Sequence, residues 1–187
     1  MQNSTKIMKS ANSFLVLDAL RKNGTMTVDA LTHSTQLSRP TVLEILEEQT
    51  SRHILTSCGK MPSNFGRHPK LYAIDTSHYF AIGIDFEFPP MRLCITDLTG
   101  HVCYERQWRC PGNHTNPEII QHLCQQIKTA LEYMSLSIEN HIGIGVGISD
   151  TVNKRSNISR NISRIPDWGT EPLHELLAQQ FPVPIYL

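Results

Sequence analysis

The sequence predicts an α+β fold in two domains, residues 1–78 and 79–187, on three observations. Its first 50 residues show the spacing of three short helices. Two short strands follow, joined by a polar connection that contains glycine and proline. After His78 the pattern changes to strands with few helices. At 187 residues and 40% apolar content, the chain is long enough for two modest domains with buried cores.

Three helices are predicted near residues 10–22, 27–35 and 38–52. Apolar residues recur at helical spacing in each of them. Thr27 and Ser38 are suited to cap the second and third helices, because a hydroxyl oxygen accepts a hydrogen bond from the first free amide groups. Pro40 falls in the first turn of the third helix, where a missing backbone donor costs little.

The remaining elements are mostly strands. Residues 54–57 and 70–74 are predicted as a β-hairpin whose long tip, residues 58–69, holds two glycines and two prolines. In the second domain we expect an antiparallel meander, then a helix opened by Pro117 and a glycine-rich buried strand. A final helix and strand complete the prediction. The meander comprises residues 80–86, 91–97 and 102–109, and the later elements are residues 142–148, 172–181 and 183–187.

Charge is unevenly distributed although the chain is neutral overall. Residues 1–75 hold nine Lys and Arg against six Asp and Glu, a balance of +3, and the remainder holds eight against eleven, a balance of −3. A surface that binds an acidic partner is therefore expected in the first domain.

Three helices followed by a hairpin are the element order of a winged helix-turn-helix domain, which predicts binding to double-stranded DNA. Apolar residues such as Leu31 and Ile45 would fix the second and third helices, leaving the opposite face of the third, including Glu48, to enter the major groove. We expect Arg39 to contact a guanine edge or a phosphate. The hydroxyl groups of Ser38 and Thr41 would contact a phosphate oxygen. The hairpin would follow the DNA backbone or place an arginine in the minor groove. The alternative is a small helical protein-interaction module with a solvated charged face. The predicted DNA-binding residues are Thr27, Ser38, Arg39, Pro40, Thr41, Glu44, Lys60, Arg67, His68 and Lys70.

No metal or cofactor is expected. The five cysteines form an odd set without a C-x-x-C pair, which is typical of reduced packing residues. The nine histidines lack metal-ligand spacing. No apolar run approaches the ~20 residues of a membrane-spanning helix, and the first 12 residues lack the apolar segment of a secretion signal, so a cytoplasmic protein is expected.

From Ala11 to Leu187 the sequence resembles the N-terminal portion of the ROK regulators (repressor, open reading frame, kinase). The resemblance implies that the second domain is the first lobe of an actin-like or sugar-kinase-like fold, which is related to ribonuclease H. The motifs that carry it, in the family's order, are Leu37–Val42, Gly66–Pro69, Ile82–Asp85, Asp97–Gly100, Gly143–Ile148 and Pro166–Gly169.

The sequence departs from the sugar kinases of that family. Their first strand leads into a glycine-rich turn that approaches the ATP phosphates, but here Asp85 is followed by Phe86-Glu87-Phe88-Pro89-Pro90. Bulky side chains and prolines remove both room and backbone donors, so we expect no enzyme activity. The family's sugar-contacting Asn-Asp pair and its zinc ligands would lie beyond Leu187, so a sugar effector is expected only if the chain continues.

These observations predict a DNA-binding transcriptional regulator that forms a homodimer and has no membrane partner. The resemblance further implies a repressor of carbohydrate-related genes. Two alternatives stay open: an assembly protein with a degenerate kinase-like lobe, and a sugar kinase with an N-terminal extension.

Overall fold

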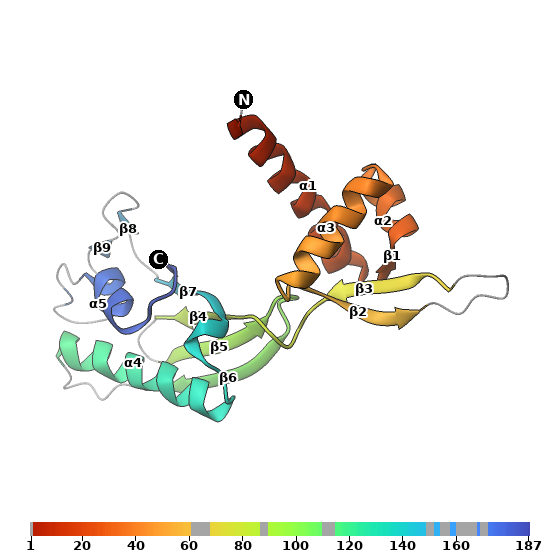
Figure 1. Cartoon of the computed structure of the whole chain (residues 1–187). Helices are drawn as coiled ribbons and strands as arrows, with labels where there is room; N and C mark the ends of the chain where they lie inside the picture. Colours follow the sequence, from red (N-terminus) through yellow and green to blue (C-terminus); the bar gives the residue numbers. More distant parts are fainter. Residues whose placement is uncertain are drawn as a thin grey trace. The chain divides into compact units, whose positions relative to one another are not determined.

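The computed structural model describes residues 2–60, 68–86, 90–109, 115–148, 152–153, 158–159, 168 and 172–187. The chain divides into two compact units, Met1–His78 and Tyr79–Leu187 (Figure 1). Helices and strands are both present, and the α+β fold class predicted from the sequence is confirmed.

The first unit packs three helices with a small sheet. The helices are α1 (Gln2–Asn23), α2 (Val28–Thr35) and α3 (Arg39–Ser51). Strands β2 (Leu55–Lys60) and β3 (Lys70–Ile74) pair antiparallel, and β1 (Met26–Thr27) adds to the other edge of β3. The core is apolar and draws on all three helices and on β2, with Val16, Leu20, Leu31, Val42, Ile45, Leu46 and Leu55 almost fully buried.

Local signals in the sequence explain where α2 and α3 begin. The Thr27 hydroxyl accepts a hydrogen bond from the Ala30 amide (3.2 Å), and the Ser38 hydroxyl accepts one from the Thr41 amide (3.3 Å). Helix α1 differs from the prediction, since it starts at Gln2 and not near residue 10. Strand β1 was not expected, because two residues carry no periodic pattern and this strand exists only by pairing with β3.

The second unit is built on a five-stranded mixed sheet in the order β10-β7-β4-β5-β6. The predicted meander is present, because β5 pairs antiparallel with both β4 and β6. Strand β7 returns parallel to β4, and β10 lies parallel to β7. The five strands are β4 (Phe80–Asp85), β5 (Met91–Asp97), β6 (Val102–Trp108), β7 (His141–Gly147) and β10 (Ile185–Tyr186).

Two helices cover one face of this sheet. Helices α4 (Asn116–Tyr133) and α5 (Leu173–Gln180) share one apolar cluster with the buried residues of β4, which are Phe80, Ile82 and Ile84. A 3-10 turn, Ile138–Asn140, precedes β7, and a two-stranded pair is formed by β8 (Val152–Asn153) and β9 (Ile158–Ser159). Among the described residues, no helix is both long and apolar enough to cross a membrane.

Candidate nucleic-acid interface

The first turn of α3 is open to solvent. Ser38, Arg39 and Pro40 are exposed, and Thr41 is partly exposed. The hydroxyl groups of Ser38 and Thr41 lie 2.8 Å apart and hydrogen-bond to each other, while Ser38 caps the helix. Because backbone amides converge at a helix N-terminus, this turn combines hydroxyl groups, a guanidinium group and the positive end of the helix dipole on one small surface.

Arg39 already has an acidic partner. Its guanidinium forms an ion pair with the carboxylate of Asp29, in the first turn of α2. More than half of each side chain remains exposed, at 56% for Arg39 and 77% for Asp29. Arginine carries five N–H donors, so a guanidinium paired on one edge retains donors for another acceptor.

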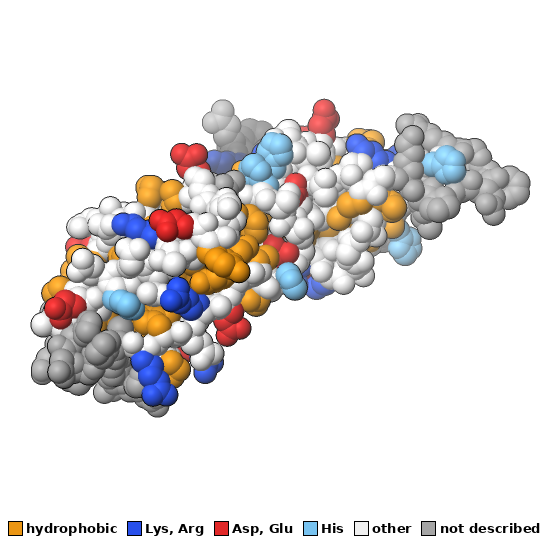
Figure 2. Space-filling view, turned by 90° about the horizontal axis from the view of Figure 1, so that it is seen from below, with side chains coloured by type: hydrophobic (Ala, Val, Ile, Leu, Met, Phe, Trp, Pro, Cys, Tyr) orange, Lys and Arg blue, Asp and Glu red, His pale blue; other side chains and the backbone are white. Residues whose placement is uncertain are grey.

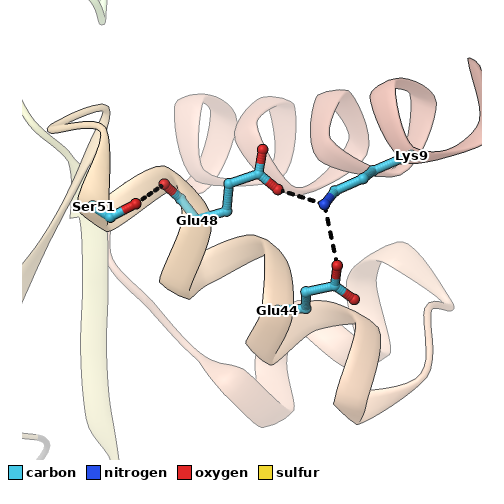
Figure 3. A network of polar contacts seen from close by, with 4 residues as sticks. All are labelled: Lys9, Glu44, Glu48 and Ser51. Carbon is cyan, nitrogen blue, oxygen red and sulfur yellow. Dashed lines mark hydrogen bonds and ion pairs between the residues drawn. The ribbon is translucent and has the colours of Figure 1, made fainter. Parts of the chain in front are cut away.

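The middle of α3 presents acidic residues to α1. The Lys9 Nζ atom lies 3.2 Å from Glu44 Oε1 and 2.9 Å from Glu48 Oε2 (Figure 3). The hydrogen bond to Glu48 and then that to Glu44 raise the pKa of Lys9 above its usual value. The Ser51 hydroxyl donates to the Glu48 carbonyl oxygen at 2.8 Å, one turn further along. Lys9 thus engages both carboxylates, a contact between α1 and α3 that was not predicted from the sequence.

The solvent side of α3 includes two residues that were missed in the sequence analysis. Leu43 is 43% exposed, and Glu47 is exposed beside it. Together with Pro40 and Glu44 they follow a helical spacing of three and four residues, opposite the buried residues of α3. That periodicity was available in the sequence and would have identified them.

The predicted wing residues lie on and near the β2–β3 hairpin. Strand register places Lys60 directly opposite Lys70. Lys70 is exposed, and its Nζ atom lies 5.0 Å from the centre of the Tyr72 ring, a cation–π contact. His68 is exposed immediately before β3, whereas Arg67 lies outside the described residues.

Ion pairs within the first unit reduce its available positive charge. Lys9 and Arg39 are paired as described, and Asp18 pairs with Arg21 (3.0 Å) and Lys22 (2.6 Å). On the face drawn in Figure 2, blue and red side chains are interspersed over the part of the molecule that is described. The exposed residues on the solvent side of α3 described above, Pro40, Leu43, Glu44 and Glu47, carry no positive charge.

In the second unit, the end of β4 carries an exposed carboxylate next to a buried aromatic ring. Asp85 ends β4 with an exposed side chain, beside a shallow hollow that Arg92, Cys94 and Glu105 also line. The next residue, Phe86, is fully buried and packs edge-on against Trp168 with ring centroids 5.3 Å apart. Among the residues the structure describes, no group of three or more His, Cys, Asp and Glu could hold a metal ion.

Comparison with known proteins agrees with this architecture. No family profile matches the chain. The putative xylose repressor of Caldicellulosiruptor sp. (strain Rt8B.4) is 22% identical over 184 residues, which are 97% of this chain and 45% of that protein. The xylose repressor of Caldicellulosiruptor bescii is 22% identical over 190 residues, 100% of this chain and 46% of that protein. The chain thus spans about half the length of these relatives.

Solved structures show the same fold. A ROK family transcriptional regulator, a homolog of the E. coli MLC protein, matches with a TM-score of 0.69 at 13% identity, over 96% of this chain and 45% of that chain. A glucokinase from Parabacteroides distasonis matches with a TM-score of 0.50 at 12% identity, over 59% of this chain and 31% of that chain. The fold thus defines a winged helix-turn-helix unit followed by a kinase-like lobe.

Sequence and fold likeness point the same way. The chain is similar to xylose repressors in sequence and to a ROK family transcriptional regulator in fold, and the resemblance predicted from its motifs is confirmed.

Proposed function

We propose that the chain is a transcriptional regulator that binds double-stranded DNA, with α3 in the major groove and the β2–β3 wing along the backbone. One observation carries the proposal: α2 and α3 pack on a common core that leaves the first turn of α3, Ser38 to Thr41, exposed. In helix-turn-helix proteins the N-terminal residues of the second of these helices contact the base edges.

Each exposed group has a role in this proposal. Arg39 donates to a guanine edge or a phosphate, while the Ser38 and Thr41 hydroxyls and the adjacent amides bind a phosphate oxygen. Pro40 and Glu44 lie at the groove surface, where a glutamate accepts a hydrogen bond from the amino group of cytosine. Four residues complete the set, with Thr27 at the cap of α2 and Lys60, His68 and Lys70 on the wing.

The wing supports the proposal through its charge. Lys60 and Lys70 occupy opposite positions of an antiparallel pair, where like charges are unfavourable in the absence of a counter-ion. A DNA phosphate supplies that counter-ion. Arg67, outside the described residues, belongs to the same proposed set.

We further propose that the regulated genes are carbohydrate-related and that regulation is repression. The support is the names of two relatives, "Putative xylose repressor" and "Xylose repressor". The protein would then act in the cytoplasm, where its operator lies. The proposal assigns no phosphoryl transfer, because fully buried Phe86 directly follows Asp85, where the sugar kinases have a glycine turn.

The test is fluorescence anisotropy with labelled duplex DNA, using a sequence enriched from a random pool by the full chain. Log affinity should fall against log salt with a slope of about −0.9 for each phosphate contacted. Arg39→Ala should weaken binding to the enriched sequence by about 1 to 3 kcal/mol, or about 5-fold to 150-fold, with less effect on random duplex. Lys70→Ala should weaken both DNAs similarly.

Arg106→Ala is the matched control, because Arg106 is an exposed arginine on β6 in the other unit and should leave affinity unchanged. A flat salt plot, or the same loss in Arg39→Ala and Arg106→Ala, would contradict the proposed interface.

A further inference from the structure

The outward face of α3 carries one large apolar side chain, Leu43, on the surface proposed to enter the major groove. Leu43 is 43% exposed, and its neighbours on this face are Pro40, Glu44 and Glu47. We propose that Leu43 is a specificity-determining residue that selects thymine in the operator by packing against the thymine C5-methyl group. The inference rests on the proposed DNA binding of α3 and names a base that this face reads.

The position of Leu43 on α3 directs it away from the core of the first unit. A single exposed leucine is ordinary on a protein surface, so its place on the helix is what distinguishes Leu43. Residues 40, 43, 44 and 47 recur at a spacing of three and four, whereas Val42, Ile45 and Leu46 are buried. At about 100° per residue, these two sets point to opposite sides of the helix.

Leu43 lies on the part of this face that is nearest to the wing. Leu43 and Glu47 line one hollow together with Lys70 of β3. Glu44, about 100° further round the helix than Leu43, is directed toward α1, where Lys9 engages it (Figure 3). A duplex that contacts both the wing and α3 therefore passes over Leu43.

The base edges of the major groove offer one group that a leucine side chain contacts favourably. The edges present the acceptors N7, O6 and O4, the amino donors N4 and N6, and the C5-methyl group of thymine. Leucine neither donates nor accepts a hydrogen bond, so packing it against a polar edge would remove water from that edge without replacing the lost bond. The thymine methyl is the apolar group of this set, and its burial against Leu43 is favourable.

The carboxylates beside Leu43 act in the same direction. Glu44 and Glu47 only accept hydrogen bonds when ionised, and guanine presents two acceptors, O6 and N7, to the major groove. Guanine beside either carboxylate would place acceptor against acceptor, whereas cytosine and adenine present an amino donor. A cation accompanies each carboxylate near the DNA phosphates, since Lys9 pairs with Glu44 at 3.2 Å. Lys70 lines the hollow beside Glu47.

Replacing single thymines by deoxyuridine tests the inference, because this change removes only the C5-methyl group and keeps base pairing. The duplex is the sequence enriched from a random pool by the full chain, and binding is measured by fluorescence anisotropy. At one thymine position, deoxyuridine should weaken binding of the parent chain about fourfold, the effect of burying one methyl-sized group. Leu43→Ala should bind the thymine and deoxyuridine duplexes equally and keep the salt slope of the parent chain.

Leu15→Ala is the matched control. Leu15 is a leucine of similar exposure, 45%, on α1, so this variant should keep the fourfold preference for thymine. Leu43→Gln is a second test, because a glutamine side chain bonds to both N6 and N7 of adenine. Sequences enriched by Leu43→Gln should carry adenine in place of thymine at the position that deoxyuridine identifies.

Three results would overturn the inference while the proposed DNA binding stands. Salt-dependent binding that no deoxyuridine weakens would show that the protein contacts no thymine methyl. A fourfold preference that persists in Leu43→Ala would assign the methyl contact to another residue. Thymine retained at that position by Leu43→Gln would do the same. A chain that binds no duplex at any salt concentration would overturn both proposals.

Discussion

Replacing Asp97 with asparagine should selectively destabilise the second unit. Asp97 ends β5, is 7% exposed, and holds the turn into β6. Its Oδ1 atom accepts hydrogen bonds from the Thr99 amide (2.8 Å), the Thr99 hydroxyl (2.6 Å) and the His101 amide (3.1 Å). Asparagine keeps an acceptor oxygen at this position but loses the charge that strengthens all three bonds.

The magnitude follows from those three hydrogen bonds. Charge-assisted hydrogen bonds contribute about 1.5 to 3 kcal/mol and neutral ones about 1 kcal/mol, and solvent around Thr99 and His101 reduces the difference. We expect Asp97→Asn to lower the free energy of unfolding of this unit by about 1 to 2 kcal/mol. At about 2 kcal/mol per M, a typical urea slope for a small domain, the urea midpoint should fall by roughly 0.5 to 1 M.

The assay is urea unfolding followed by tryptophan fluorescence. Both tryptophans of the chain, Trp108 and Trp168, lie in the second unit, so this signal does not report on the first. Asp85→Asn is the control, because Asp85 ends the neighbouring strand β4 with its side chain exposed, and its midpoint should equal that of the parent chain.

Acidification provides a second readout of the same hydrogen bonds. Burial raises the pKa of Asp97, but hydrogen bonds from the Thr99 side chain, the Thr99 amide and the His101 amide outweigh it, so the pKa lies below its ordinary value. The stabilisation is therefore fully present above the unfolded pKa of about 3.9 and is lost as pH falls through the folded pKa. The gap between the parent chain and Asp97→Asn should be constant from pH 7 to pH 5 and shrink below pH 4. Equal midpoints at pH 7, or a gap that widens in acid, would refute the reasoning.

Three further variants test the fold and the interface. Ser38→Ala should lower the free energy of unfolding of the first unit by about 1 kcal/mol, because it removes the cap of α3. Circular dichroism should show a lower melting temperature for this variant, whereas Ser38→Asp should keep the melting temperature of the parent chain. Gly143→Ala should destabilise the second unit by about 1 to 3 kcal/mol in urea unfolding, since a Cβ there would lie 2.9 Å from the Pro184 carbonyl oxygen. Lys9→Met should weaken DNA binding at low salt by leaving two carboxylates on α3 unpaired, and exposed Lys128→Met is its control in anisotropy measurements. An affinity in Lys9→Met equal to that of the control would show that these carboxylates lie away from the DNA.

The candidate interface was predictable where its signals are local. The Ser38 cap, Pro40 in the first turn and the exposed Arg39 all follow from a few consecutive residues. The ion pair between Glu48 and Lys9 was not predicted, because the two residues are 39 positions apart in sequence and no local pattern reports that contact. Leu43 was missed although its helical spacing was visible.

The same distinction between local signals and long-range contacts applies to the whole chain. Hydrogen bonds and side-chain periodicity within a few residues determine the order of the helices and strands, and the sequence therefore sufficed for α2, α3 and the β4–β6 meander. Long-range pairing determines the rest. Strand β1 exists because β3 offers it an edge, and α1 presents Phe14 to solvent because Val16 and Lys9 are held on its other side. Such contacts depend on where distant elements meet in space, and only the folded chain specifies that.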